Sequence, residues 1–205
     1  MANTITLNYP NGDRYVGQIN YTVDSRILPH GTGTKYYING DVYNGNFYFD
    51  QFHGYGIYKS ITGDIYKGTY HQNLRHGQGE TFRASDQRRY IGGFYMGSEE
   101  GHATITVVDF AMNGGAKKYI GHMKNGRRHG QGTQWVTGPD GLLTAFEGQW
   151  YNGLLNGPGT EIHPTRCLSG TFVNGKLEGA GIYKDSQTGV AYQVVFQGGM
   201  IVRYL

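Results

Sequence analysis

The sequence has few of the residues that build a covalent framework, a membrane span or an export signal. Its single cysteine, Cys167, cannot form a disulfide within the chain, which favours a reducing, intracellular setting. No stretch approaches the ~20 apolar residues of a membrane span. The opening residues, MANTITLNYPNGD, lack the basic and apolar regions of a secretory signal. The net charge of +3 is too small to indicate a dedicated nucleic-acid binder, so nucleic acid is not an expected partner.

Glycine and tyrosine stand where aliphatic residues usually dominate. The 205 residues include 35 glycines and 18 tyrosines, and aromatic residues make up 14% of the chain. Glycine usually accounts for about 7% of a protein, and a high content can indicate disorder. The aromatic content argues against a chain too polar to fold. The order of this chain must therefore come from something other than an aliphatic core.

The pattern Tyr-x-Gly-x-aromatic recurs along the chain. Its copies start at Tyr15, Tyr43, Tyr66, Tyr90, Tyr119, Phe146 and Leu168, with a decayed copy at Tyr192. A Gly-x-Gly pair or a near variant follows each of the first seven. The first glycine of that pair comes 11 residues after the leading residue in copies two to seven and 16 residues after it in the first, whereas the next connection varies in length. One fixed and one variable connection predict a meander of β-hairpins.

Residues 0, +2 and +4 of the pattern point to the same face of a strand. The glycine between two aromatic residues leaves a space, and we expect a ring from the adjacent strand to lie in it. The segments 11–13, 39–41 and 62–64 read NGD or TGD, and their glycines can adopt the positive φ of tight turns. The pattern leaves open which face carries bulky second-strand residues such as Tyr58 and Trp135.

These motifs resemble the MORN (membrane occupation and recognition nexus) repeat. Residues 43–58, YNGNFYFDQFHGYGIY, and 119–135, YIGHMKNGRRHGQGTQW, match it closely, while the fourth copy, YIGGFYMGSEEGHAT, departs from it. The resemblance implies an all-β fold, an elongated single-layer twisted antiparallel sheet with one hairpin per repeat. The expected single domain, 1–205, comprises a half-repeat 1–14, the repeats 15–42, 43–65, 66–89, 90–118, 119–145, 146–167 and 168–191, and a C-terminal cap 192–205.

The resemblance further implies a non-enzymatic scaffold in a cytoplasmic, cytoskeletal, ciliary, flagellar axonemal or cortical assembly. We expect the aromatic and glycine face to form a groove that holds a helix or extended segment of a protein partner. The expected anchors are Tyr43, Phe47, Tyr66, Tyr70, Tyr90, Phe94, Tyr119, Phe146 and Trp150. The C-terminal strand could pair with a second copy of the chain. A regulatory piece of an enzyme whose catalytic chain is separate is a further alternative.

Basic residues at the turns support an alternative function, a peripheral module that binds anionic phospholipids such as phosphoinositides. The candidate contacts are Arg75, Lys117, Lys118, Lys124, Arg127 and Arg128. A solvated turn face explains the same residues. Acidic residues such as Glu99 and Glu178 in the matching turns interrupt any continuous basic stripe.

Two insertions lengthen the same kind of connection in neighbouring copies, at 107–118 and 136–145. They carry Phe110, Met112, Leu142 and Leu143, which would need a partner if exposed. The alternative, that they fold back and cover part of the sheet, is equally consistent with the sequence.

The sequence predicts no catalytic set, metal site or cofactor. A histidine precedes the first glycine of the pair at positions 30, 53, 76 and 129. Equivalent positions in adjacent hairpins lie about 9–10 Å apart, whereas each Zn²⁺ ligand must lie within ~2.1 Å of the metal. We therefore expect these histidines to hydrogen-bond their own turns.

Overall fold

A computed structural model describes residues 4–109, 115–138 and 141–205 of the chain. Every regular element in these ranges is a β-strand, which confirms the all-β hairpin meander. The chain divides into two compact units, residues 1–98 and 99–205. The prediction of one domain with the repeat boundaries given above stays a prediction.

The first unit contains eight strands within the described residues. They are β1 (Ile5–Asn8), β2 (Arg14–Tyr21), β3 (Ile27–Tyr36), β4 (Val42–Tyr48), β5 (Gln51–Lys59), β6 (Ile65–His71), β7 (Leu74–Arg83) and β8 (Arg88–Tyr95).

The second unit contains the remaining nine, again counted over the described part of the chain. They are β9 (Ser98–Asp109), β10 (Gly115–Lys124), β11 (Arg127–Thr137), β12 (Leu143–Tyr151), β13 (Leu154–His163), β14 (Arg166–Val173), β15 (Lys176–Asp185), β16 (Ala191–Gln197) and β17 (Met200–Tyr204).

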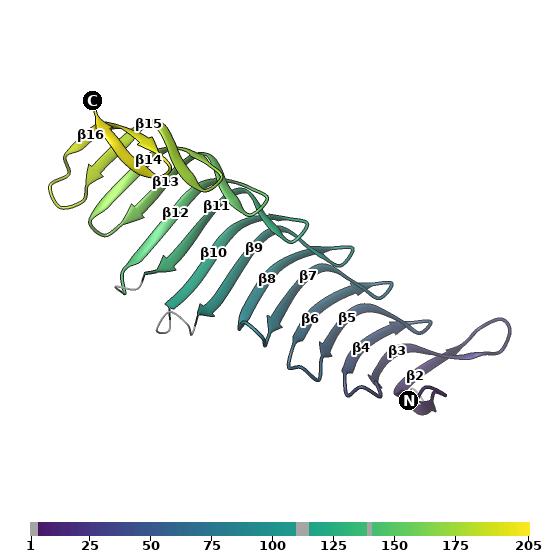
Figure 1. The fold of residues 1–205 in the computed structure, drawn as a ribbon. Helices are drawn as coiled ribbons and strands as arrows, with labels where there is room; N and C mark the ends of the chain where they lie inside the picture. Colours follow the sequence, from purple (N-terminus) through teal and green to yellow (C-terminus); the bar gives the residue numbers. More distant parts are fainter. Residues whose placement is uncertain (1–3, 110–114, 139–140) are drawn as a thin grey trace. The chain divides into compact units, whose positions relative to one another are not determined.

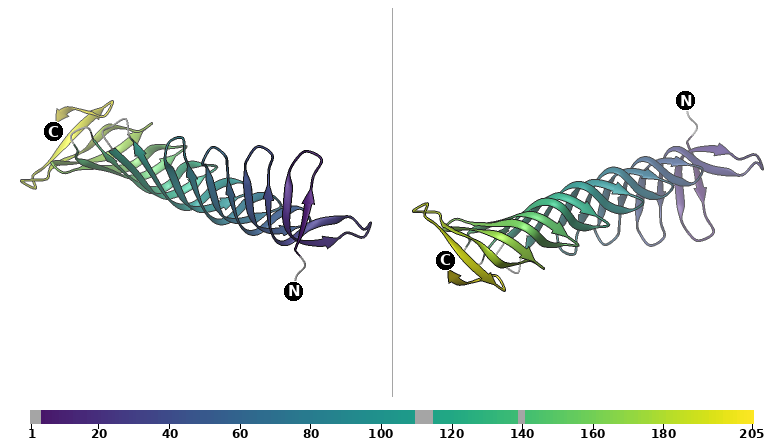
Figure 2. Two further views of the ribbon diagram at one scale, coloured as in Figure 1. Left: turned by 90° about the horizontal axis from the view of Figure 1, so that it is seen from below. Right: turned by 90° about the horizontal axis from the view of Figure 1, so that it is seen from above.

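Within each unit, strands that are neighbours in the chain pair antiparallel. Figure 1 shows the hairpins in chain order, with two kinds of turn at opposite ends of the strands. In each unit the strands lie in one twisted layer (Figure 2). A single layer has no second sheet to pack against, so it must be stabilised by contacts between neighbouring strands.

The fixed spacing of 11 residues has its cause in a two-residue turn. In the second copy, β4 and β5 are joined by Phe49 and Asp50, whose φ angles are 46° and 64°. Positive φ at both central residues is the type I′ geometry that suits the twist of a hairpin. The matching turns of the later copies use pairs such as Asn152 and Gly153, with φ of 49° and 91°. The first copy has a longer loop between β2 and β3, which accommodates its five extra residues.

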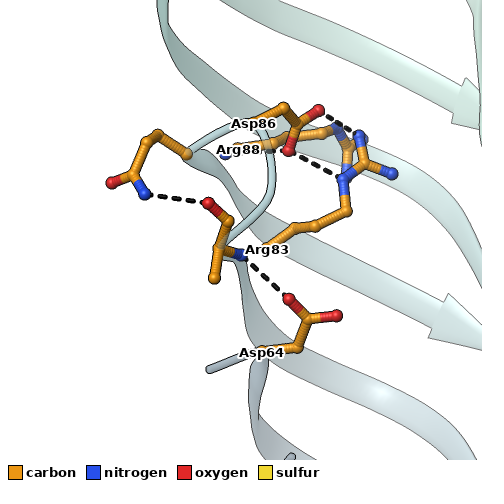
Figure 3. A network of polar contacts seen from close by, with 6 residues as sticks. Asp64, Arg83, Asp86 and Arg88 are labelled. Carbon is orange, nitrogen blue, oxygen red and sulfur yellow. Dashed lines mark hydrogen bonds and ion pairs between the residues drawn. The ribbon is translucent and has the colours of Figure 1, made fainter. Parts of the chain in front are cut away.

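The opposite ends of the hairpins are linked from one repeat to the next by aspartates. Asp13 and Asp41 accept hydrogen bonds from the backbone N–H groups of Ile38 and Ile61, at 3.0 and 2.8 Å. Asp64 does the same for Ala84 at 2.9 Å, beside the ion pair that Arg83 forms with Asp86 (Figure 3). The glycines of the NGD and TGD turns have φ of 90–92°, as predicted. The aspartate of each of these turns therefore fixes the position of the following turn.

The glycines of the motif do provide space for rings, but in most copies the ring comes from a different strand than predicted. Tyr43 lies over Gly45 of its own strand and Gly56 of the next strand, and a Cβ added at Gly56 would lie 2.4 Å from the tyrosine hydroxyl. The leading tyrosines of copies one, three and five, Tyr15, Tyr66 and Tyr119, lie in the same way over their own glycines. The Tyr43 ring is held over its own strand because its hydroxyl donates a hydrogen bond to the Asn46 carbonyl, three residues further along that strand.

Near the C-terminal end the ring over the second glycine of the Gly-x-Gly pair comes from the strand that follows it, rather than from the strand that precedes it as in Gly56. A Cβ at Gly159 of β13 would lie 3.1 Å from the ring of Phe172 on β14. A Cβ at Gly181 of β15 would lie 2.5 Å from the ring of Phe196 on β16. Copy seven begins with Leu168 in place of tyrosine, and the corresponding ring position is filled from the adjacent strand.

The register slips by two residues between Gly45 and Phe47, where β4 faces β5. Gly54, opposite this bulge, has a φ of 68°, a left-handed conformation that favours glycine. Beyond the bulge the alternation of side chains resumes. Tyr58, two residues after Gly56, therefore lies on the same face as the Tyr43 ring, and residues three positions on, such as Trp135 after Gly132, lie on the opposite face.

We predict that Gly56→Ala lowers the free energy of unfolding by about 3 kcal/mol, because the added methyl group overlaps the Tyr43 ring. Gly97→Ala is the control. Its methyl group would meet only Leu74, at 3.9 Å, so nothing is displaced. The expected loss of stability comes from the positive φ of 89° alone and is about 1 kcal/mol. Urea denaturation of the unmodified protein and the two variants measures both losses of stability. Equal losses in the two variants would contradict the contact between the Tyr43 ring and Gly56.

Candidate functional site

The predicted groove anchors lie in the protein's own core. Tyr43, Tyr90 and Phe47 have 0%, 0% and 3% of their surface exposed. The other members of the set, Tyr66, Tyr70, Phe94, Tyr119 and Trp150, are also buried, and Phe146 is half-buried. Their contact with a partner stays a prediction, and their burial leaves little ring surface for it.

Edge-to-face ring contacts explain this burial. Phe47 meets Tyr43 of its own strand at a centroid distance of 5.1 Å and Tyr15 of the preceding repeat at 5.0 Å. Tyr70 and Phe94 repeat the same arrangement one and two hairpins further on. The last aromatic residue of the motif therefore packs against two leading tyrosines in copies two to four. Burial raises the pKa of Tyr66 to about 12, so its hydroxyl remains a hydrogen-bond donor at neutral pH.

Two of the predicted lipid contacts point into this core face. The Arg128 guanidinium lies 4.4 Å from the Trp150 ring centroid and donates a 2.7 Å hydrogen bond to the Gly153 carbonyl. Burial lowers the pKa of Arg128 from its ordinary value. Arg75 lies over Phe94 at 5.1 Å and donates to the Gly97 carbonyl at 2.8 Å. Both arginines therefore join a repeat to the turn of the next one, which limits their access to a membrane surface.

The other basic residues are more accessible. Lys118, Lys124 and Arg127 are exposed, and Lys117 is half-buried. A hollow in the second unit is lined by Lys124, Asn125, Arg127, His129, Tyr151 and Asn152. These side chains could meet an anionic group, and their contact with lipid stays a prediction.

The two leucines of the second insertion are exposed, whereas residues 136–138 and 144–145 on either side of them are half-buried. Leu142 and Leu143 have 38% and 51% of their surface exposed. This favours the reading in which the insertion does not cover the sheet. Phe110 and Met112 lie outside the described residues.

The histidines before the glycine pairs form a site that the sequence analysis missed. Nδ1 of His30, His53 and His76 is buried without a hydrogen-bond partner. The expectation that these histidines hydrogen-bond their own turns was therefore wrong for these three. The rings instead pack against other rings on the face opposite the tyrosine core.

Six rings form a continuous row across β3 to β8 of the first unit, and we call it the ring row. Its members, in strand order, are His30, Tyr48, His53, His71, His76 and Tyr95. Successive ring centroids are 5.1–5.8 Å apart, and the ring planes are inclined at 48–57° to each other. The repeat unit places one ring of the row on each strand from β3 to β8.

Exposure alternates along the ring row. Tyr48 and Tyr95 have 53% and 63% of their surface exposed, and His71 is also exposed. The other three members, His30, His53 and His76, are half-buried. The exposed rings lie on the first strands of their hairpins, so every second strand carries a ridge.

The strip of the same face beside the ring row carries no charge. Its residues are Thr32, Asn46, Tyr55, Thr69 and Gln78. Tyr55 is 55% exposed, and together with Thr32, Asn44, Asn46 and Ile57 it lines a depression in the sheet. The ring row and this strip form an uncharged surface that is rich in hydrogen-bonding groups.

The corresponding positions of the second unit do not form a row. Glu100 and Lys124 stand where copies four and five would supply rings, and Asn156 and Glu178 follow in copies six and seven. One pair is left, His129 and Tyr151, with centroids 5.3 Å apart and Tyr151 58% exposed. The sequence does contain a signal for the ring row, because Tyr48, His71 and Tyr95 each stand five residues after the leading tyrosine of their copy, at position +5. Their residue types differ, however, and each must be combined with a histidine on another strand before the row can be recognised.

Among the described residues, no group of three histidine, cysteine or acidic side chains could hold a metal ion. Over the same residues, no helix is long and apolar enough to cross a membrane.

Comparison with known families agrees with the repeat geometry. The MORN repeat model matches residues 25–42, 43–65, 66–85, 119–139, 146–167 and 169–187, more than half of the chain. The chain therefore belongs to the MORN repeat family. The matched ranges leave out 90–118, the copy that departs from the motif.

Alsin from Homo sapiens and from Pan troglodytes is 29% identical over 115 residues, which is 55% of this chain and 7% of Alsin. This chain therefore matches only a small part of that relative. Among solved structures, the TCP domain of SAS-4 (dCPAP) from Drosophila melanogaster is 11% identical with a TM-score of 0.44, over 94% of this chain and 90% of that one. The TCP10 domain of Danio rerio CPAP is 13% identical with a TM-score of 0.26, over 98% and 99%.

We predict that Arg128→Ala lowers the free energy of unfolding by about 2 kcal/mol, through the lost contact with Trp150 and the lost hydrogen bond to Gly153. Arg127→Ala, the exposed neighbour, should stay within about 0.5 kcal/mol of the unmodified protein. Arg128→Leu should recover part of the loss, because Leu155 and Leu177 occupy this position in later copies. Thermal and urea denaturation test all three, and a similar effect of the Arg127 and Arg128 substitutions would overturn the assignment.

Proposed function

We propose that the chain is a non-enzymatic scaffold that binds protein partners through the ring row. The observation that carries this proposal is the exposure of Tyr48, His71 and Tyr95 on an uncharged surface. Exposed aromatic side chains that lie together are typical of interaction surfaces. Membership of the MORN repeat family supports the role of an interaction module.

The buried tyrosine face gives this surface its rigidity. Tyr48 directly follows Phe47, and Tyr95 directly follows Phe94, so each exposed ring is held by a neighbour that is 3% exposed. A rigid surface loses little conformational entropy when a partner binds. The earlier expectation, a partner held against the core rings themselves, is a less favourable version of the same function because those rings are already in contact with each other.

The setting and the assembly are also part of the proposal. The settings in which MORN repeat proteins commonly occur support an intracellular, cytoplasmic location within a cytoskeletal, ciliary, flagellar or cortical structure. Pairing of β17 with a second copy of the chain is a further proposal. It is supported by the exposure of Met200, Val202 and Tyr204, at 71%, 54% and 59%.

We expect alanine substitution of Tyr48, His71 and Tyr95 together to abolish the capture of specific partners from a native cell extract. Tyr151→Ala, which removes a similarly exposed tyrosine of the second unit, should leave that capture unchanged. Mass spectrometry of cross-linked complexes measures both, and circular dichroism verifies that the variants fold. Unchanged capture by the triple variant would contradict the proposed surface.

A second candidate function is the binding of anionic lipid headgroups. The hollow that contains the exposed Lys124 and Arg127 favours it. On this alternative, vesicles that contain phosphoinositide bind the protein, and binding falls as salt rises. Lys124→Glu combined with Arg127→Glu should then weaken binding by about tenfold or more, since each basic residue near the surface contributes about 1 kcal/mol. Failure of the unmodified protein to sediment with such vesicles would exclude this candidate.

A further inference from the structure

The spacing of the ring row indicates the conformation of its occupant. Strands in a sheet lie about 4.8 Å apart, so the exposed rings on alternate strands recur every ~9.6 Å. A polyproline II helix has three residues per turn and rises 3.1 Å per residue, which is a repeat of about 9.3 Å. A segment in this conformation that crosses the strands therefore presents one side chain to each gap between the ridges at Tyr48, His71 and Tyr95.

The hydrogen-bonding groups of the ring row match the same conformation. A neutral imidazole carries one proton, and an N–H group buried without an acceptor is costly. Because Nδ1 is buried and unpartnered in His30, His53 and His76, the proton is best placed on Nε2, on the other side of the ring. These N–H groups and the hydroxyls of Tyr48 and Tyr95 are donors. A polyproline II segment has no internal hydrogen bonds, so its carbonyls are available as acceptors.

The charges of the surface also select the occupant. The ring row and the strip beside it contain no carboxylate, ammonium or guanidinium group, whereas Glu100 and Lys124 stand at the equivalent positions of the second unit. A charged segment would gain no partner on this surface and would lose water. A proline-rich segment is uncharged, lacks backbone N–H donors and packs its rings well against aromatic side chains.

From this match of period, donors and charge we propose that the ring row binds a proline-rich segment of a partner protein in the polyproline II conformation, laid across strands β3 to β8. This inference rests on the proposed function and names the chemistry of its partner. The row spans five strand spacings, about 24 Å, which accommodates roughly eight residues of such a segment.

The test measures the fluorescence anisotropy of labelled decaproline on addition of the full chain. A Gly-Ser peptide of equal length is the control for a flexible, uncharged segment. Decaproline should bind at least about tenfold more tightly than the control, and Tyr48→Ala with Tyr95→Ala should weaken its binding by about tenfold or more. Tyr151→Ala should leave the affinity within about twofold. Tyr48→Phe with Tyr95→Phe, which keeps the rings and removes two donors, should give an intermediate loss.

A random-peptide display library separates this inference from the function on which it rests. Peptides that bind the unmodified protein but not the Tyr48→Ala, Tyr95→Ala variant should be enriched in proline. Row-dependent peptides without proline, or decaproline binding that survives the double substitution, would overturn the polyproline assignment and leave the proposed function intact. A library that yields no row-dependent peptide would contradict both.

Discussion

The contact on which the structure depends is a tyrosine ring lying on two glycines. The ring of Tyr43 covers Gly45 on its own strand and Gly56 on the neighbouring strand, and its hydroxyl bonds to the Asn46 carbonyl. Each part of this contact needs the others, because a side chain on either glycine would displace the ring. It allows a sheet with few aliphatic residues to bury large side chains in a single layer.

The frame is shared by the repeats, whereas certain positions are free to differ. Position +9, nine residues after the leading residue of a copy, illustrates this on the core face. Copies two, six and seven have Phe52, Leu155 and Leu177 there, whereas copies three and five have Arg75 and Arg128. The guanidinium groups fill the space of an apolar side chain and also bond to the next turn. On the opposite face, positions +5 and +10 differ in the same way, with rings in the first unit and charged residues in much of the second. Position +9 is occupied by a core side chain in each of these copies, whereas positions +5 and +10 supply the surface that we propose binds a partner.

The sequence was sufficient to predict the hairpins, because the spacing of 11 residues and the NGD turns have local causes. It was not sufficient to place side chains relative to solvent. Arg127 and Arg128 are adjacent, and only the register of β11 decides which of them enters the core. The rings of Tyr43 and Phe47, which we expected to line a groove, are buried by edge-to-face contacts with Tyr70 and Tyr15, and the sequence did not indicate this burial. The ring row could not be predicted from the sequence pattern, because its members occupy two different positions of the motif and are of two residue types.

Within each unit, strands that are neighbours in the chain hydrogen-bond to each other and are joined by short turns. Contact order is therefore low for an all-β protein, and little loop-closure entropy is lost before native pairing begins. Folding can nucleate at one hairpin and propagate to its neighbours. A chain emerging from the ribosome would complete one hairpin before the next is synthesised, so that a growing edge is matched by its natural partner within a few dozen residues of translation.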